Sequence, residues 1–440
     1  SGALRSAYKL TYDQAPLSNA SRLTAVTRYG TDAAIAADGT ISGGTAKPLG
    51  QMTYQNTDGL YTSVNSALAG APNETGDLDF DGRDEIFGDG INKSQNSGGH
   101  DGSPTNVWTR TKHIYKFNSD GTPIGTISLQ LDSISKPVDG IDYTPKYFSR
   151  PGRFLSTKNT MDFATAVTSS SFNGATGAIT YSTTRSIVQT TPQLSMTKVG
   201  CAPAGYEAVC AAIPASAAGA FVADADGDGI DTLDKGGSPF GVGDFLGNGR
   251  QQPIYRSGDS SVKKGVFSVD KWQPGGTSFD ITTGPCVLAD INGDGATDIV
   301  HYNQGGSTRV FLSTGIGFKG YVKHDADGDI GILRDFDNDG RMDLITLSNS
   351  DLQTQPYSTG TVKIYFLQPS STDFTPVRFY LPVAMTAGSP VGDFNGDGLP
   401  DFTDYHDHMF ISAPGAGNPN LLRSVVTELG GTIAVEYAPS

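Results

Sequence analysis

The sequence predicts an all-β fold, a six- or seven-bladed β-propeller with calcium-binding loops, plus terminal strands that belong to an adjoining β-sheet or shell. Three observations lead to this prediction. An acidic nine-residue loop recurs along the 440 residues, short apolar runs typical of strands flank it, and its later copies are evenly spaced. These copies begin at residues 244, 290, 335 and 393, at intervals of 46, 45 and 58 residues. Such a period suits one four-stranded blade per copy.

Glycine content favours the same fold class. The chain has 56 glycines, which is about 13% of its residues against a usual value of about 7%. No collagen-like period accompanies them. Many tight turns are therefore expected between short strands.

The copy at 290–298 shows why the loop predicts a metal site. Oxygen-bearing side chains at positions one, three, five and nine can converge on one hard cation, Gly295 at position six allows a sharp turn, and the carbonyl of Ala296 adds a ligand. Magnesium requires tighter octahedral geometry and usually keeps several waters, so this flexible set favours calcium. An EF-hand would need a bidentate glutamate at position twelve, where the full copies have Gly88, His301, Thr346 and Asp404.

Five copies supply candidate calcium ligands, and about four to five bound ions are expected. We name each copy by its first residue, so that loop 77 is 77–85, and likewise for loops 224, 290, 335 and 393. The candidate ligands are Asp77, Asp79, Asp81, Glu85, Asp224, Asp226, Asp228, Asp290, Asn292, Asp294, Asp298, Asp335, Asp337, Asp339, Asp343, Asp393, Asn395, Asp397 and Asp401.

Two copies depart from the pattern. Loop 224 has Thr232 at position nine and begins only 20 residues before loop 244, which is too short for a blade, so we expect it in an inserted or inter-blade connection. Loop 244 has Leu246 at position three and Gln252 at position nine. It should therefore keep the shape of the loop without a well-made metal site.

The formal net charge of −15 is concentrated in these loops. Seventeen of the 46 acidic residues are candidate ligands, which leaves 29 acidic residues against 31 lysines and arginines. Bound cations would thus neutralise most of the excess charge. The chain has no basic tract or basic helix, so nucleic acid is not an expected partner.

The predicted domains are N-terminal strands over 1–56, a propeller over 57–420 with an insertion near 136–220, and a C-terminal hairpin over 421–440 that leads to following repeats. Strand patterns occupy 8–12, 22–27 and 51–54, and hairpin turns are expected at Asp38-Gly39, Asp120-Gly121 and Asn173-Gly174. No apolar run approaches 18 residues and no signal-peptide pattern is present. We therefore expect no membrane span and an export signal located elsewhere.

Cysteine spacing suggests one local disulfide. Cys201 and Cys210 flank a short loop that contains Pro203 and Gly205, which suits a bridge in an oxidising compartment. Two small buried thiols are the alternative. Cys286 is most simply a core residue.

Two further clusters carry weaker signals. His406-Asp407-His408 resembles a transition-metal or acid–base site, but two residues that alternate on a strand can simply flank a blade loop. Asp325, Asp327 and Asp329 repeat half of the loop pattern with Ile330 where glycine is needed, which favours a plain acidic turn.

Asp-Phe-Asn-Gly-Asp-Gly-Leu-Pro-Asp-Phe at 393–402, with its recurrence, resembles the FG-GAP or VCBS repeat family, in which each loop joins two strands of a propeller blade. The segments 8–12, 21–26 and 421–437 look like those that flank the propeller in Rhs/YD-repeat proteins. Within that group, the chain most resembles the B components of insecticidal toxin complexes. In that group the propeller closes one end of a hollow β-shell around a toxic fragment and docks on a translocation component. No YD repeats, autoprotease region or toxic domain lie within these 440 residues.

The resemblance implies a non-enzymatic, calcium-stabilised propeller that acts as a docking and gating module of a secreted bacterial Rhs-type toxin or surface protein. Its expected partners are a translocation component or host surface protein and the Rhs shell of the same polypeptide, at an extracellular or bacterial cell-surface location. The alternative is an adhesin that binds host protein or glycan through the propeller face. No Gly-x-Ser-x-Gly elbow or phosphate loop points to an enzyme.

A propeller also needs its first and last blades joined. The blade that begins at Asp393 has too few residues for four strands, so a strand from the N-terminal side, around 51–54, should complete it. The outer segments 23–29 and 422–437 should then pair with each other beside the propeller, with Gly430-Gly431 as a turn.

Overall fold

A computed structural model gives the structure of this chain. It describes residues 4–15, 21–55, 61–65, 74–97, 104–201, 203–214, 220–234, 241–259, 264–269, 278–279, 286–303, 307–318, 322–324, 331–336, 340–347, 360–367, 374–377, 382–383, 390–403, 408–412 and 421–437. Within these residues the predicted all-β class is confirmed, since the regular structure is strands apart from one short helix, α1 (Glu207–Ala212).

Six antiparallel sheets of the described residues each contain a path of four strands, and in five of them the strands follow chain order. Those five are β7 (Glu74–Gly76), β8 (Glu85–Asn96), β9 (Thr105–Phe117) and β10 (Pro123–Pro137); β11 (Lys146–Gly152), β12 (Asp162–Asn173), β13 (Ala178–Thr190) and β14 (Met196–Val199); β17 (Gly241–Gly243), β18 (Gln252–Asp259), β19 (Lys264–Val269) and β20 (Ser278–Phe279); β21 (Cys286–Ala289), β22 (Asp298–Asn303), β23 (Ser307–Phe311) and β24 (Val322–His324); β25 (Gly331–Arg334), β26 (Asp343–Leu347), β27 (Gly360–Leu367) and β28 (Phe374–Val377), with β29 (Pro382–Val383) also paired to β27. The sequence-predicted turns at Asp120-Gly121 and Asn173-Gly174 join β9 to β10 and β12 to β13.

The sixth sheet closes the propeller. It contains β30 (Val391–Gly392), β31 (Asp401–Thr403), β32 (His408–Ser412) and, from the other end of the chain, β6 (Tyr61–Asn65). The expected contribution of an N-terminal strand is therefore confirmed, but its predicted position was wrong. Residues 51–54 belong to β5 (Ala46–Tyr54) instead, because their backbone pairs with β33 (Leu422–Thr427) and the Tyr54 hydroxyl donates to the Leu23 carbonyl at 2.9 Å.

The first strands of successive sheets contact one another. β11 contacts β15 (Phe221–Ala223), β15 contacts β17, β17 contacts β21, β21 contacts β25, and β30 contacts β7. Successive sheets therefore meet along their first strands and build outward, which is the arrangement of propeller blades. β15 pairs only with β16 (Thr232–Asp234) among the described strands, so loop 224 joins the two strands of a small sheet. This sheet contacts β11 on one side and β17 on the other, which agrees with the expected inserted or inter-blade position. The blade number of six or seven stays a prediction.

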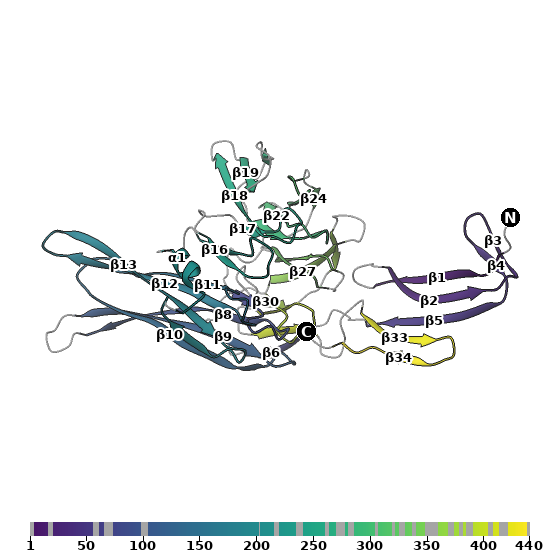
Figure 1. Cartoon of the computed structure of the whole chain (residues 1–440), viewed down its shortest axis with the longest axis horizontal. Helices are drawn as coiled ribbons and strands as arrows, with labels where there is room; N and C mark the ends of the chain where they lie inside the picture. The colour runs from purple at the N-terminus through teal and green to yellow at the C-terminus, as the bar shows by residue number, and fades with distance from the viewer. Residues whose placement is uncertain are drawn as a thin grey trace.

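Strands from both ends of the chain form a separate five-stranded sheet. Its order is β1 (Ala7–Gln14), β2 (Ser21–Tyr29), β5, β33 and β34 (Thr432–Ala434). The expectation that 23–29 and 422–437 pair directly was wrong, because β5 lies between them, although they do share this sheet. The predicted C-terminal hairpin and the turn at Asp38-Gly39, which joins β3 (Ala33–Ile35) to β4 (Ile41–Gly43), are confirmed. Figure 1 shows the purple and yellow strands side by side, away from the other sheets.

Apolar side chains from neighbouring sheets form the core between the blades. Phe87 and Ile114 of one sheet meet Phe163 and Val188 of the next, all at 2% exposure or less. At the closure, Phe117 of β9 lies with its ring centroid 5.1 Å from that of Phe394 in loop 393. Burial of side chains of this size is worth about 2 kcal/mol or more each, so it holds successive blades face to face.

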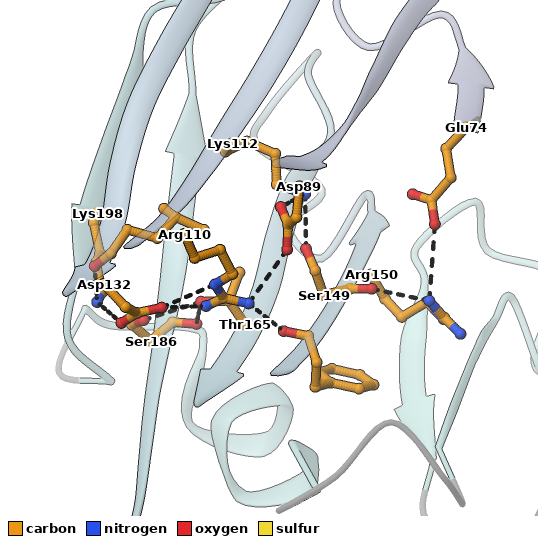
Figure 2. A network of polar contacts seen from close by, with 12 residues as sticks. Glu74, Asp89, Arg110, Lys112, Asp132, Ser149, Arg150, Thr165, Ser186 and Lys198 are labelled. Atoms are coloured by element: carbon orange, nitrogen blue, oxygen red, sulfur yellow. Dashed lines mark hydrogen bonds and ion pairs between the residues drawn. The ribbon is translucent and has the colours of Figure 1, made fainter. Parts of the chain in front are cut away.

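A buried network of charged groups joins the β7–β10 sheet to the β11–β14 sheet (Figure 2). Arg110 is fully buried, pairs with Asp132 at 2.6 Å and donates to the Phe148 carbonyl at 3.1 Å. Lys112 lies 2.6 Å from Asp89 and donates to Ser149 Oγ at 2.9 Å. Burial lowers the pKa of Lys112, and the Asp89 carboxylate opposes that change. Both cations are therefore tolerated in the interior because carboxylates and neighbouring-sheet acceptors meet them.

The helix α1 is tied to its sheet by the predicted disulfide. Cys201 and Cys210 are bonded, with Cα atoms 5.7 Å apart. Cys210 packs with Tyr206, Val209 and Ile213 in the core cluster of the β11–β14 sheet.

Closure of the ring also depends on Asp84. Its backbone N–H donates to the Asp393 carbonyl at 2.7 Å, and its Oδ2 accepts the Asp393 N–H at 2.9 Å. A Cβ on Gly392 would lie 2.5 Å from this oxygen, so glycine is needed there for the close approach. Asp84 thus joins the first and last loops through a reciprocal pair of hydrogen bonds.

Loss of the disulfide should destabilise the β11–β14 sheet. Cys201→Ser and Cys210→Ser should each cost about 2–3 kcal/mol, because the bridge restricts the unfolded chain. The double variant should cost no more than either single one, as measured by urea denaturation without reductant. Additive costs would contradict a bond between these two residues.

Asp84→Ala should weaken closure by about 1–2 kcal/mol, because the Asp393 N–H loses its acceptor. Asp84→Asn is the matched control and should cost less, since its amide oxygen can still accept. Equal stability of the alanine variant and the wild-type protein in chemical denaturation would show that this contact does not hold the ring.

Candidate metal-binding loops

The position-one aspartate folds each loop around its own carboxylate. In loop 290, Asp290 Oδ1 accepts the N–H of Gly293 at 2.8 Å and Oδ2 accepts that of Gly295 at 2.8 Å. The position-six N–H donates to the same aspartate oxygen in every one of the six loops, at 2.6–2.9 Å, through Gly82, Gly229, Gly249, Gly295, Gly340 and Gly398. The loops therefore share one backbone conformation, set by a charge-assisted hydrogen bond.

Position four also requires a left-handed backbone, which the sequence analysis did not use. Gly227, Gly247, Gly293 and Gly396 occupy it with φ from 63° to 77°. In loop 77 the same position holds Phe80, at φ 56°. A bulky residue in this region is strained, and the Phe80 ring lies against the Arg153 guanidinium, 5.8 Å from its centre.

Position nine serves the fold as well as the predicted metal site. In loop 393, Asp401 Oδ2 accepts the Phe394 N–H at 2.9 Å and Oδ1 accepts the Ser412 N–H at 2.7 Å. Asp298 does the same with Ile291 at 3.0 Å and Ser313 at 2.7 Å. Glu85, Gln252 and Asp343 each bond the position-two N–H of their own loop, at 2.9–3.0 Å. This residue therefore links the loop to the strands that it joins.

Burial makes the position-nine acids costly to ionise. Burial is the main reason that the pKa of Glu85 rises to about 8 and that of Asp298 to about 7. Burial also raises the pKa of Asp401. The carboxylates at positions one and five of loops 290 and 393 add to the effect. A cation among these groups would favour their charged form.

The structure brings together part of the predicted ligand sets. Asp224, Asp226 and Asp228 can each place one carboxylate oxygen within 4.8 Å of the others, and so can Asp77, Asp79 and Glu85; no other set of three acidic, histidine or cysteine groups does so within the described part of the chain. In loops 290 and 393 the position-three asparagine donates to the position-five aspartate, at 3.0 Å in both. In loop 335, Asp335 accepts the Gly340 N–H and Asp343 accepts the Phe336 N–H, as the equivalent residues do in the other loops.

Some predicted residues lie outside the described residues. They are Asp337 and Asp339 of loop 335, and also Asp325, Asp327, Asp329, His406 and Asp407. His408 begins β32, and its side chain is not among those described.

In loop 77 a lysine side chain lies among the carboxylates. Lys116 of β9 bonds Asp79 Oδ2, and its Nζ lies 3.0 Å from Asp81 Oδ2 and 3.9 Å from Glu85 Oε1. Asp81 also pairs with Arg83 at 2.5 Å. Sequence analysis missed Lys116, which is separated from the loop by most of two strands.

The donor chemistry of these loops fits a hard divalent cation. Loop 224 offers three carboxylates in reach of one another, and loops 290 and 393 offer carboxylates and an amide oxygen. In loop 393, burial and the neighbouring Asp397 raise the pKa of Asp393 to about 7.

Neighbouring loops are hydrogen-bonded to one another. The position-eight N–H donates to the position-one carbonyl of the preceding loop, from Thr297 to Asp244 at 2.7 Å, from Gln251 to Asp224 at 2.8 Å and from Asp84 to Asp393 at 2.7 Å. Each position-one aspartate named here thus folds its own loop with its side chain and holds the next loop with its main chain.

The loop with a degraded sequence keeps the common fold. Asp244 accepts the N–H groups of Asn248 at 3.1 Å and Gly249 at 2.6 Å, and Gln252 Oε1 accepts that of Phe245 at 3.0 Å. The expectation that loop 244 retains its shape is confirmed. It shows that the scaffold does not depend on a complete ligand set.

No helix among the described residues is long and apolar enough to cross a membrane. No curated protein sequence matches the chain.

Three solved structures are similar to this chain at low identity. The crystal structure of TcdB2-TccC3-Cdc42 matches 96% of this chain and 18% of that chain, at 14% identity and a TM-score of 0.42. TcdB2-TccC3 without its hypervariable C-terminal region matches 98% and 18%, at 14% identity and a TM-score of 0.40. BBS1N in complex with ARL6DN, soaked with lead, matches 79% and 94%, at 11% identity and a TM-score of 0.29. The chain thus spans less than a fifth of the length of the first two.

A family model gives the identification that the loops lead to. The model described as FG-GAP-like repeat matches residues 335–402, which contain both loop 335 and loop 393. This part of the all-β chain is therefore similar to FG-GAP-like repeats.

Proposed function

We propose that this chain is a non-enzymatic, calcium-stabilised β-propeller that serves as a docking and gating module of a secreted bacterial Rhs-type toxin or surface protein. The observation that carries the proposal is the five-stranded sheet, in which β5 from the N-terminal part is paired with β33 from the C-terminal part. The FG-GAP-like repeat at 335–402 supports the propeller part of the proposal.

The terminal sheet favours a module set within a larger assembly. Among the described strands it shares no pairing with the blades, and its two edge strands are β1 and β34. Tyr8, Leu10 and Tyr12 alternate on β1 and are each about half exposed, and Ile433 on β34 is exposed as well. Open edges and exposed apolar side chains normally pair with further structure. The shell of the same polypeptide is the partner that the sequence resemblance implies.

The proposed calcium sites are loops 224, 290, 335 and 393. Their ligands are the candidate oxygens at positions one, three and five, with those of position nine where it is acidic. When bound, calcium supplies a compact positive charge that offsets the crowded carboxylates. The residues themselves fold and position the loop, because position one accepts the loop N–H groups and position nine bonds to the strands. The ion is therefore expected to stabilise the folded loop without being needed for its conformation.

The disulfide supports an extracellular or cell-surface location. Cys201 and Cys210 are bonded, and bonds of this kind persist in oxidising environments and are rare in the cytosol.

Calcium should raise the stability of the chain in proportion to the logarithm of its concentration. Each site with a dissociation constant near about 10⁻⁴ M should add about 2.7 kcal/mol at about 10 mM calcium, because only the folded state binds the ion. Thermal unfolding in chelator and in calcium measures the difference. An unchanged melting temperature would refute the calcium part of the proposal.

A matched pair of variants separates ion binding from loop folding. Asp290→Ala and Asp244→Ala each remove a carboxylate that accepts loop N–H groups. Both should lower stability in chelator, but only Asp290→Ala should reduce the gain produced by calcium, because loop 244 has Leu246 at position three and no acid at position nine. An equal calcium-induced gain in Asp290→Ala and the wild-type protein would exclude loop 290 as a site.

Docking can be tested with the purified chain. Biolayer interferometry against the translocation component of an insecticidal toxin complex should give saturable binding, whereas binding to host glycans or host surface protein alone would support the adhesin. Reduced and denatured chain serves as the control for nonspecific attachment.

A further inference from the structure

Loop 77 contains a positive charge supplied by the protein itself. The Lys116 ammonium contacts the carboxylates at positions three, five and nine, namely Asp79, Asp81 and Glu85. The Asp79 and Glu85 side chains are 2% and 1% exposed, and that of Lys116 is 19% exposed. These are three of the positions through which the other loops would hold an ion.

An ammonium and a divalent cation cannot share this place. Both would lie within a few ångströms of the same carboxylate oxygens, and their mutual repulsion is strong where water is largely excluded. Lys116 donates to the position-three and position-five carboxylates at once, as a bound ion would be ligated by them. It therefore competes with an ion for the same ligands.

Strand register distinguishes loop 77 from loops 290, 335 and 393 by this lysine. Ile86 pairs with Tyr115, which places Lys116 opposite position nine. The same register places Leu312, Phe366 and Ile411 opposite position nine of loops 290, 335 and 393. Those three loops thus have an apolar residue at the register position that Lys116 occupies in loop 77.

The neighbouring β11–β14 sheet repeats the arrangement with a different lysine. Its second strand begins at Asp162, as β8 begins at Glu85. Lys158 donates to Asp162 Oδ1 at 2.7 Å, and the Thr190 N–H donates to the same oxygen at 2.9 Å. Lysine side chains therefore neutralise the acidic group at this corner in two adjacent sheets.

We infer that Lys116 is the residue that excludes calcium from loop 77: its ammonium replaces the divalent cation there, and the loop folds without calcium. The inference rests on the proposed calcium role for the other loops. It differs from the sequence-based expectation that Asp77, Asp79, Asp81 and Glu85 hold an ion, which stays untested. Asp79 Oδ1 is buried without a hydrogen-bond partner, so the loop keeps a spare ligand for an ion once the ammonium is removed.

The test is the number of calcium ions bound per chain, measured by native mass spectrometry of the full chain. Lys116→Leu, which copies Leu312, should bind one ion more than the wild-type protein, and its melting temperature should fall in chelator and recover with calcium. Lys116→Gln should do the same and serves if the leucine variant folds poorly. An unchanged ion count in both variants would overturn the inference.

A second variant tests the same point in the wild-type background. Asp79→Asn should leave the calcium count unchanged, because loop 77 holds no ion while Lys116 is present; a loss of one ion would overturn the inference. The two proposals can fail separately. A wild-type protein that binds no calcium refutes the role proposed for the other loops, whereas a rise from zero to one ion in Lys116→Leu would still support the inference about Lys116.

Discussion

The propeller loops depend on the hydrogen bonds that the carboxylate of the position-one aspartate accepts. Its two oxygens accept N–H groups that would otherwise point into the turn without a partner, and the adjacent main-chain carbonyl accepts an N–H from the next loop. Local folding and the joining of blades are thus performed by the same residue. Loop 244, which lacks two ligand positions but keeps Asp244, has the same hydrogen bonds as its neighbours.

Contacts between blades combine apolar packing with buried charge. The apolar residue at position two is buried in loops 77, 244, 290, 335 and 393, as Leu78, Phe245, Ile291, Phe336 and Phe394. Between the β7–β10 and β11–β14 sheets, Arg110 and Lys112 add hydrogen bonds that only one relative placement of the two sheets can satisfy. Apolar packing stabilises the contact through the area it removes from water, whereas loss of one partner of a buried ion pair would leave an uncompensated charge.

Periodic features of the structure could be predicted from the sequence. The loop spacing gave the all-β class and the flanking strands, and cysteine spacing gave the bond between Cys201 and Cys210. Features that depend on contacts distant in sequence could not be predicted. Lys116 meets loop 77 only through the pairing of β8 with β9, and nothing near it in sequence marks it as a substitute for an ion. Residues 51–54 have the alternation of a blade strand, and only the presence of β33 decides that they join another sheet. Phe80 shows that a position requiring a left-handed backbone need not be glycine.

The pairing of the two chain ends has a consequence for synthesis of the protein. The Thr53 hydroxyl is hydrogen-bonded to that of Ser424, which is 371 residues later in the chain. Likewise, β6 is synthesised long before β32, the strand with which it pairs. A ribosome that adds about 5–20 residues per second would leave β5 and β6 without these partners for roughly 20 seconds or more. During that time their exposed edges could pair with other chains. Secretion or chaperone binding that begins while the chain is still growing would therefore meet a propeller that is open on one side.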